Sequence, residues 1–277
     1  MTDDSPTQAE KAERFRALHE GPGPFLLANA FDAGSARILA GMGFDALATS
    51  SGGFAGTLGR RDGCVTREEA LTHARAVVDA SDLPVSADLE NGFGHEPSAA
   101  AKTVQLAAKA GLVGCSIEDH SGDKELGFYD FDSATARIAA SADAARAVGF
   151  DFTLTARSEN FIRGNPDLED TIARLQAYEA AGADVLMAPA LPDIESVSAV
   201  CAAISKPFNF MVGMPGKSFP VADLAAAGVS RISLATSLYR AAMSGLVEAA
   251  TEAKENGTFA YVDTSVPSPQ LSGYMRS

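Results

Sequence analysis

The chain has 277 residues, of which 46% are hydrophobic and 21% charged, and its formal net charge is −14. This charge argues against nucleic acid or an anionic membrane surface as a partner, but it does not exclude an anionic substrate, because a bound metal and one buried arginine can reverse the local sign. We expect no membrane span, no signal peptide at 1–20, and a reducing cytoplasmic location, because Cys64, Cys115 and Cys201 show neither disulfide nor zinc spacing.

A unit recurs along the chain: a short apolar run, a loop, and then an amphipathic, alanine-rich segment. The apolar runs are Pro24–Asn29, Ala46–Thr49, Val85–Asp88, Val113–Glu118, Phe152–Arg157, Val185–Met187, Phe208–Val212 and Arg231–Leu234. The helical patterns are Ala33–Met42, Arg67–Ala80, Ser98–Ala110, Ser133–Val148, Leu168–Ala181, Ile194–Ile204, Val221–Ala227 and Ser237–Glu255. Apolar strands that alternate with helices predict a parallel sheet covered by helices.

Glycine recurs where each predicted helix meets the next strand, at Gly43, Gly111, Gly149, Gly182 and Gly228. A glycine in this position is typical of a left-handed helix cap. The recurrence favours an α/β fold of the (β/α)₈ (TIM) barrel type, with a doubly wound open sheet as the alternative. We expect residues 1–277 to form one barrel domain, with a C-terminal helix and arm from about 237 whose tail, from Gly257, docks on another surface.

Polar residues gather where the predicted strands end, which is where barrel enzymes carry their catalytic groups. They are Ser50-Ser51-Gly52-Gly53, Arg60-Arg61-Asp62-Gly63, Asp88-Leu89-Glu90, Glu118-Asp119-His120 and Arg157-Ser158-Glu159. Several carboxylates on one rim repel each other, and a hard divalent cation such as Mg²⁺ resolves the conflict with one or two direct carboxylate ligands. The alternative is that these acids cap helices or pair with arginine, and it weighs most for Asp119 and Glu159.

Two other groups at these strand ends suit an anionic ligand. The hydroxyls and backbone N–H groups of Ser50, Ser51 and Gly52 predict a small nest that can bind a substrate carboxylate, although a plain loop is the alternative. Arg157 ends an apolar strand, where a charge is costly unless it is paired. It is expected to clamp an anionic substrate, to pair with a rim acid, or to do both. His19 and His73, on predicted helices, are interpreted as surface residues.

Taken in order, these segments resemble the isocitrate lyase/phosphoenolpyruvate mutase superfamily. Asp88–Gly94 resembles its D-x-D-x-G-[YF]-G segment, and Ser116–Asp119 resembles its I-E-D segment. Thr49–Gly52, Gly59–Asp62, Ala156–Glu159 and Ala181–Asp184 resemble its carboxylate loop, G-x-x-D, A-R-x-E and A-G-A-D, respectively. The matches run from about Asn29 to Ala235, nearly the whole chain, and they are specific only as a set.

The resemblance implies a barrel with a Mg²⁺ or Mn²⁺ site. Asp88 would be the principal metal ligand, and Asp62, Glu90 and Glu118 would hold metal waters. Ser50, Ser51 and Gly52 would bind the substrate carboxylate, and Arg157 its other oxygens. The superfamily acts on small 2-oxo acids or their enolates, making or breaking C–C or C–P bonds, and it usually forms tetramers in which the last helix is swapped between neighbouring subunits.

The chain departs from the family in the loop after the fourth strand, His120–Asp130. The family lyases resemble each other in a K-[KR]-C-G-H loop whose Cys is the general acid, and the phosphonate mutases carry K-x-N-S there. This loop has no Cys, and Lys124 is followed by Glu125-Leu126-Gly127. The mutase His after strand six is also absent, and Glu90 stands where many members have Asp. The proton donor is therefore expected to be His120, Tyr129, Lys124 or water.

The sequence thus favours a Mg²⁺-dependent lyase or decarboxylase acting on an oxaloacetate-like or 2-alkylmalate-like acid. A metal that draws charge from the ketone oxygen lets the neighbouring bond break to give an enolate. In that reading, Arg157, Glu118 and His120 are the candidate catalytic residues, and Ser50, Ser51, Gly52 and Asp88 bind substrate. One alternative is P–C bond chemistry on phosphonopyruvate. A second is a catalytically weak barrel that binds a dicarboxylate.

Overall fold

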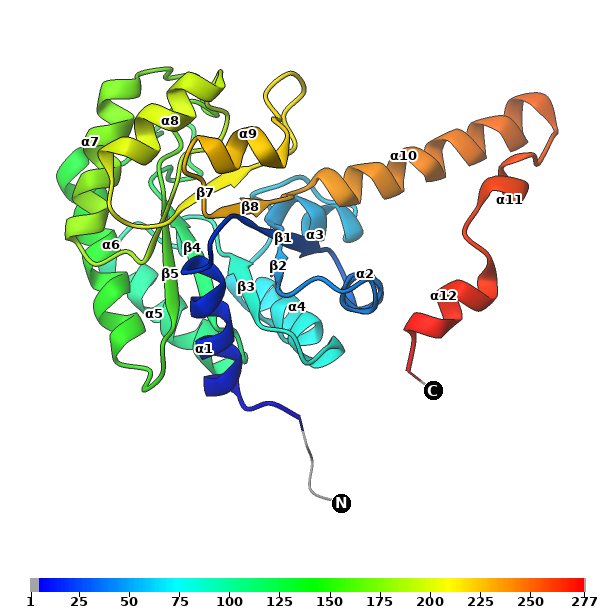
Figure 1. Ribbon diagram of the computed structural model, residues 1–277, viewed down its shortest axis with the longest axis horizontal. Helices are drawn as coiled ribbons and strands as arrows, with labels where there is room; N and C mark the ends of the chain where they lie inside the picture. Colours follow the sequence, from blue (N-terminus) through cyan, green and yellow to red (C-terminus); the bar gives the residue numbers. More distant parts are fainter. Residues whose placement is uncertain (1–4, 277) are drawn as a thin grey trace.

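Residues 5–276, as described by the computed structural model, form a closed barrel of eight parallel strands in chain order (Figure 1). Each strand pairs with the next, and β8 closes on β1 with Arg231 opposite Phe25. The predicted barrel is confirmed, and an open sheet is excluded because no edge strand remains. The strands are β1 Phe25–Ala30, β2 Leu47–Thr49, β3 Val85–Asp88, β4 Gly114–Glu118, β5 Thr153–Arg157, β6 Val185–Met187, β7 Phe208–Met211 and β8 Arg231–Ser233.

The eight predicted helical segments all form helices, within two residues of their expected starts. They are α2 Ala33–Gly41, α4 Arg67–Ala80, α5 Pro97–Lys109, α6 Phe131–Arg146, α7 Leu168–Ala180, α8 Ile194–Ala203, α9 Val221–Ala226 and α10 Ser237–Thr251, which continues into the π-helical turn η1 Glu252–Asn256. The glycines predicted to end helices have left-handed backbones, with φ of 89° at both Gly43 and Gly111 and 101° at Gly182. A side chain would strain these turns, so glycine fixes where each helix stops.

Helix α1, Gln8–His19, closes the end of the barrel where the strands begin. A capping box between Thr7 and Glu10 starts it. Its buried stripe of Ala12, Phe15 and His19 faces inward, and Phe15 packs in a cluster with Leu27, Ala46 and Val113, which lie in or just before three strands. The polar N-terminal segment therefore supplies a plug for the barrel, and only residues 1–4 of it lie outside the described part.

Both histidines interpreted as surface residues are buried, so that interpretation is wrong. His19 is 9% exposed and His73 is 8% exposed. Each ring faces a backbone carbonyl, a hydrogen-bond acceptor that the sequence did not reveal. His19 Nδ1 lies 2.8 Å from the Phe15 carbonyl oxygen, and His73 Nε2 lies 3.0 Å from the Phe31 carbonyl oxygen. Buried imidazoles of this kind are stabilised by one backbone bond and by packing, and His73 stacks on Phe54 at 4.0 Å.

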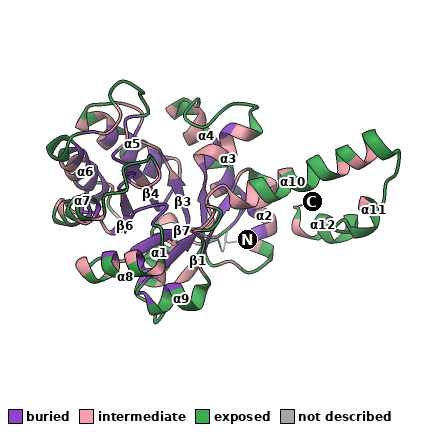
Figure 2. Ribbon diagram, turned by 90° about the horizontal axis from the view of Figure 1, so that it is seen from above, coloured by how far each residue is buried: buried purple, intermediate pink, exposed green. Residues whose placement is uncertain are grey.

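The C-terminal arm leaves the barrel along α10 and carries two further helices, α11 Tyr261–Thr264 and α12 Ser268–Tyr274 (Figure 1). In Figure 2 this arm projects beside the barrel and is largely exposed. Only its end returns, where the Tyr274 ring packs so closely on Gly41 of α2 that no side chain fits there. Within residues 5–276, no helix combines the length and apolar character needed to cross a bilayer.

Candidate active site

A cavity of about 180 Å³ opens among the C-terminal ends of the strands. This is the end of the barrel at which the sequence placed the polar residues. A cavity of this size has room for several water molecules, and it therefore suits a small ligand. Its lining includes Ser50, Ser51, Asp62, Asp88 and Arg157 of the predicted site.

The predicted carboxylate-binding nest and the predicted metal ligand meet in this cavity. Ser50 caps a short helix that the sequence did not predict, α3 Ser51–Thr57. Ser51 donates to Asp88 Oδ2 twice, from its hydroxyl at 2.8 Å and from its backbone N–H at 3.3 Å. At Gly52, an added Cβ would lie 2.9 Å from Thr236 Cγ2 and 3.2 Å from Asp62 Oδ2. Glycine is needed here because three segments of chain approach one point.

The carboxylates around Asp88 raise one another's proton affinity. Burial, followed by the charge of Asp88, raises the pKa of Asp62. Burial and the charges of Asp88 and Asp62 raise the pKa of Glu90 to about 7. Burial and the charge of Glu159 raise the pKa of Glu118 well above its usual range. The site thus holds more negative charge than its protein surroundings stabilise, and a cation would relieve it.

The donor set fits a hard cation that keeps much of its water. Within residues 5–276, no group of three His, Cys, Asp or Glu side chains is close enough to form a ready protein cage. Mg²⁺ does not need one, because one or two carboxylates suffice. Asp88 is the central carboxylate, with the Ser51 hydroxyl 2.8 Å from Oδ2 and the Ser116 hydroxyl 3.5 Å from Oδ1. All the atoms that these groups could offer to a metal ion are oxygens.

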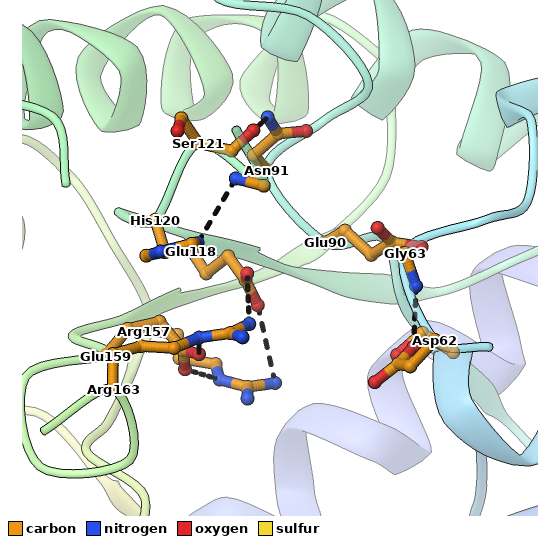
Figure 3. A network of polar contacts seen from close by, with 12 residues as sticks. Asp62, Gly63, Glu90, Asn91, Glu118, His120, Ser121, Arg157, Glu159 and Arg163 are labelled. Carbon is orange, nitrogen blue, oxygen red and sulfur yellow. Dashed lines mark hydrogen bonds and ion pairs between the residues drawn. The ribbon is translucent and has the colours of Figure 1, made fainter. Parts of the chain in front are cut away.

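Arg157 lies among carboxylates, as Figure 3 shows. Its guanidinium is 3.6 Å from Glu118 Oε2 and 3.8 Å from Asp88 Oδ1, and it contacts Glu159 directly. Burial lowers the pKa of Arg157, but the charges of Glu159, Glu118 and Asp88 outweigh burial and raise it overall. Arg163 completes the cluster, 3.4 Å from Glu118 and 2.9 Å from Glu159. Arg157 therefore pairs with the rim acids at the same time as it lines the cavity.

Asp119 and Glu159 are paired with arginine, which is the alternative that the sequence analysis raised for them. Glu159 binds Arg157 and Arg163. Asp119 accepts hydrogen bonds from the Glu159 N–H at 2.8 Å, the Tyr178 hydroxyl at 2.7 Å and Arg174 at 3.3 Å. Asp119 thus lies behind the site and holds the backbone that carries Glu159, which in turn orients Arg157.

The three protein groups expected as proton donors lie outside the cavity lining. His120 Nδ1 accepts from the Gly122 N–H at 3.1 Å, and burial lowers the pKa of its ring. The Tyr129 hydroxyl lies 3.0 Å from His95 Nδ1 in a separate cluster. Lys124 is exposed on the loop between them, which is closed by a bridge from His120 to Phe128.

The sequence analysis missed the polar side chains inside the barrel. Most barrels of this type fill the interior with bulky branched residues. Here the inward positions leave space, and the cavity lining includes polar residues that the sequence did not predict as part of the site: Asn29, Ser86, Ser116, Asn209, Arg231 and Ser233. Residues two apart on a strand face the same way, so the alternation in Ser86/Asp88, Ser116/Glu118 and Arg231/Ser233 was the available signal.

Comparison with known proteins identifies the family. The family model for phosphoenolpyruvate phosphomutase matches residues 15–254. The chain is 34% identical over 199 residues to the 2-methylisocitrate lyase of Salmonella typhimurium, covering 69% of this chain and 64% of that protein.

Solved structures agree with this assignment. A Burkholderia cenocepacia protein that is named only by class, as a lyase/mutase, is 48% identical with a TM-score of 0.95, over 98% of this chain and 97% of that one. The 2,3-dimethylmalate lyase is 26% identical with a TM-score of 0.85, over 95% and 94%. These relatives are named as lyases and mutases of small carboxylic acids. The chain belongs to the phosphoenolpyruvate mutase/isocitrate lyase superfamily.

Proposed function

We propose that the chain is a Mg²⁺-dependent lyase or decarboxylase that acts on a small 2-oxo or 2-hydroxy di- or tricarboxylic acid. The observation that carries this proposal is the convergence of Ser51, Asp62 and Asp88 at the mouth of one cavity. Its size suits a small acid, and the named lyase relatives act on acids of this kind. Arg157 is already held by three carboxylates, which leaves it poorly suited to a phosphoryl group.

The residues take distinct roles in this proposal. Asp88 would hold Mg²⁺, or Mn²⁺ in its place, and Asp62, Glu90 and Glu118 would hold the metal's waters. The metal would supply Lewis-acid stabilisation of the enolate charge that develops as the bond breaks. Ser50, Ser51 and Gly52 would bind the substrate carboxylate through N–H and O–H donors.

Arg157 would stay beside the reacting carbon, because its ion pairs with Glu118 and Glu159 hold its guanidinium in one position. Of the expected proton donors, water is the one that the cavity admits, since His120, Tyr129 and Lys124 lie outside its lining. We infer that a water molecule in the cavity protonates the product. His120 stays a catalytic candidate only for a state in which its loop has moved.

We also propose that the protein works as a homo-oligomer, a tetramer by family resemblance. Large apolar side chains on α10 and the following arm are strongly exposed, among them Leu246 at 60%, Val247 at 63% and Phe259 at 62%. Exposed apolar surface of this extent marks an interaction site. Sedimentation should show an assembly larger than the monomer, and deletion of the chain after Ser237 should dissociate it.

The experiment is to assay pyruvate release from a panel of 2-oxo acids and 2-alkylmalates with Mg²⁺, including oxaloacetate and phosphonopyruvate. We expect release from oxaloacetate or an alkylmalate, and its loss with a chelator and in Asp88→Ala. Asp79→Ala is the matched control, because Asp79 lies on the surface of α4, away from the cavity, and pairs with Arg75. Activity on phosphonopyruvate alone, or oxalate binding without any turnover, would contradict the proposal.

A further inference from the structure

A second buried arginine lies deep in the same cavity. Arg231, the first residue of β8, is 3% exposed and lines the cavity. Its Nε donates to Asn209 Oδ1 at 2.8 Å, and its Nη2 donates to Thr155 Oγ1 at 2.9 Å from across the barrel. Its Nη1 lies 3.2 Å from His19 Nε2 on the plug helix α1. The guanidinium therefore spans the floor of the barrel.

None of these partners carries a negative charge. His19 Nδ1 faces the Phe15 carbonyl and must donate to it, so Nε2 is left to accept from Arg231 and the ring is neutral. Burial, followed by the charge of Arg231, lowers the pKa of His19 to about 3, which keeps it neutral. Within residues 5–276, no carboxylate oxygen lies within 4.0 Å of the Arg231 nitrogens. Burial alone lowers the pKa of Arg231 to about 9.

Arg231 also has donors to spare. A guanidinium has five N–H groups in a planar fork, and three contacts are recorded for Arg231 in the described part of the chain. A buried charge without a counter-charge costs several kcal/mol unless something compensates it. The remaining N–H groups and the uncompensated charge together specify an anion, and a carboxylate matches the fork of a guanidinium best.

The floor and the mouth of the cavity are joined by a short run of hydroxyls. Ser116 Oγ is 3.5 Å from Asp88 Oδ1, and Ser116 is the register partner of Thr155, which contacts Arg231. With neighbouring strands about 4.8 Å apart, the distance from the Arg231 guanidinium to the Asp88 carboxylate is on the order of 10 Å. Met187 and Met211 line the wall of the cavity. A ligand can thus reach from the mouth to the floor past hydroxyl groups and two methionine side chains.

We propose that Arg231 is the floor of a second carboxylate subsite, which makes the protein selective for dicarboxylates. The first carboxylate would lie at the Ser50–Gly52 nest, the carbon chain along Met187 and Met211, and the distal carboxylate on Arg231 and Ser233. This inference rests on the proposed function, because the nest and Asp88 fix the other end of the ligand.

The test is calorimetric binding of three probes in the presence of Mg²⁺: oxalate, 2-oxoglutarate and 2-oxopentanoate, which lacks the distal carboxylate. The wild type should bind 2-oxoglutarate at least about tenfold more tightly than 2-oxopentanoate. Arg231→Met should remove this preference and leave oxalate binding unchanged, because oxalate is too short to reach the floor. We expect Arg231→Met to fold, because no ion pair of Arg231 is broken and methionine has a similar length.

Arg240→Met is the matched control, because Arg240 is an exposed arginine at the rim of the same cavity and donates to the Gly213 carbonyl at 3.0 Å. It should keep the preference for 2-oxoglutarate. A preference that is lost in Arg240→Met and kept in Arg231→Met would overturn the proposal. If Arg231→Met does not fold, a crystal structure of the wild type with 2-oxoglutarate decides, since the distal carboxylate must contact Arg231.

The same data separate the two proposals. A wild type that fails to bind oxalate with Mg²⁺ but prefers 2-oxoglutarate refutes the metal site and retains the floor subsite. A wild type that binds oxalate and shows no preference between the two longer acids refutes the floor subsite alone.

Discussion

Two arginines of the barrel strands, Arg157 and Arg231, line the cavity, and their surroundings are opposite. Arg157, at the mouth, has Asp88, Glu118 and Glu159 within ion-pair distance. Arg231, at the floor, has only the neutral groups of His19, Thr155 and Asn209 as recorded partners. Both are almost fully covered by protein, so burial alone does not decide how a charge is stabilised.

Because of this difference, the two ends of the cavity carry opposite charge. The acids at the mouth outnumber the cations there, and burial, followed by the charges of neighbouring carboxylates, raises the pKa values of Asp62, Glu90 and Glu118. At the floor, Arg231 is positively charged, and its side-chain partners within residues 5–276 are the neutral groups of Asn209, His19 and Thr155. A metal ion at the mouth and a carboxylate at the floor would each neutralise one end. A cavity of this kind favours a ligand that is an anion at both ends and can share one end with a metal.

The largest expected effect comes from removing the positive charge of Arg157 at the mouth of the cavity. Arg157→Met leaves Glu118 and Glu159 buried without their main counter-charge, so we expect it to lower the free energy of unfolding by about 3–5 kcal/mol at neutral pH. Urea unfolding followed by circular dichroism measures the change. Arg60→Met is the control, because the Arg60–Glu69 pair is 45% and 35% exposed, and it should cost less than about 1 kcal/mol.

A loss of less than about 1 kcal/mol in Arg157→Met would show that Arg163 alone stabilises the acids. In that case, the different surroundings of Arg157 and Arg231 would have no measurable effect on the stability of the fold. Adding Glu159→Gln to Arg157→Met should recover part of the lost stability, because the double variant no longer buries a Glu159 carboxylate that has lost one of its two arginine partners.

The next largest effect is expected at Gly52, where the mouth is assembled. Gly52→Ala forces either Thr236 or Asp62 to move, since the new methyl would lie 2.9 Å and 3.2 Å from them. A displacement of this kind in a catalytic constellation costs about a hundredfold in kcat/KM. Gly23→Ala, ahead of β1, meets open space and should leave the rate unchanged. Equal rates in the two variants would contradict this prediction and would show that the added methyl does not displace Asp62.

The mouth of the cavity could be predicted from the sequence because its residues follow a local rule. Asp88, Glu118 and Arg157 each end a strand, and strand ends of a parallel barrel meet at one rim. Glycines after five of the helices marked where those helices end. Together with the apolar runs, they allowed the eight strand–helix units to be delimited from the sequence. Motif order then indicated the family, which the comparisons confirmed.

The floor could not be predicted in the same way. Arg231 was interpreted as the start of an apolar strand, and His19 as a surface residue of a polar segment. Their contact joins residues 212 positions apart, and it exists only because α1 plugs the barrel. Asn209 and Thr155 reach the same point from two other strands. The strand pattern does show which face these residues occupy, but nothing local shows that their tips converge.

The smallest expected effect is a pH dependence of stability at the floor. The pKa of His19 is lowered to about 3 in the folded protein, from the ordinary value of 6.5, chiefly by burial and next by the charge of Arg231. Between these values the unfolded chain binds a proton that the folded protein does not, so stability is lost as the pH falls below about 6.5. From about pH 7.5 to pH 5, this group should remove about 2 kcal/mol of stability.

His19→Gln tests this, because glutamine can still accept from Arg231 but does not titrate. The variant should lose about 2 kcal/mol less than the wild type over the same pH interval, measured by urea unfolding at both pH values. Arg231→Met should fall between them, because it removes the second cause of the shift and leaves burial, the first. Identical pH dependence in all three proteins would mean that His19 takes up its proton at the same pH in the folded protein as in the unfolded chain. In that case, His19 would not be the neutral partner of Arg231 that its contacts indicate.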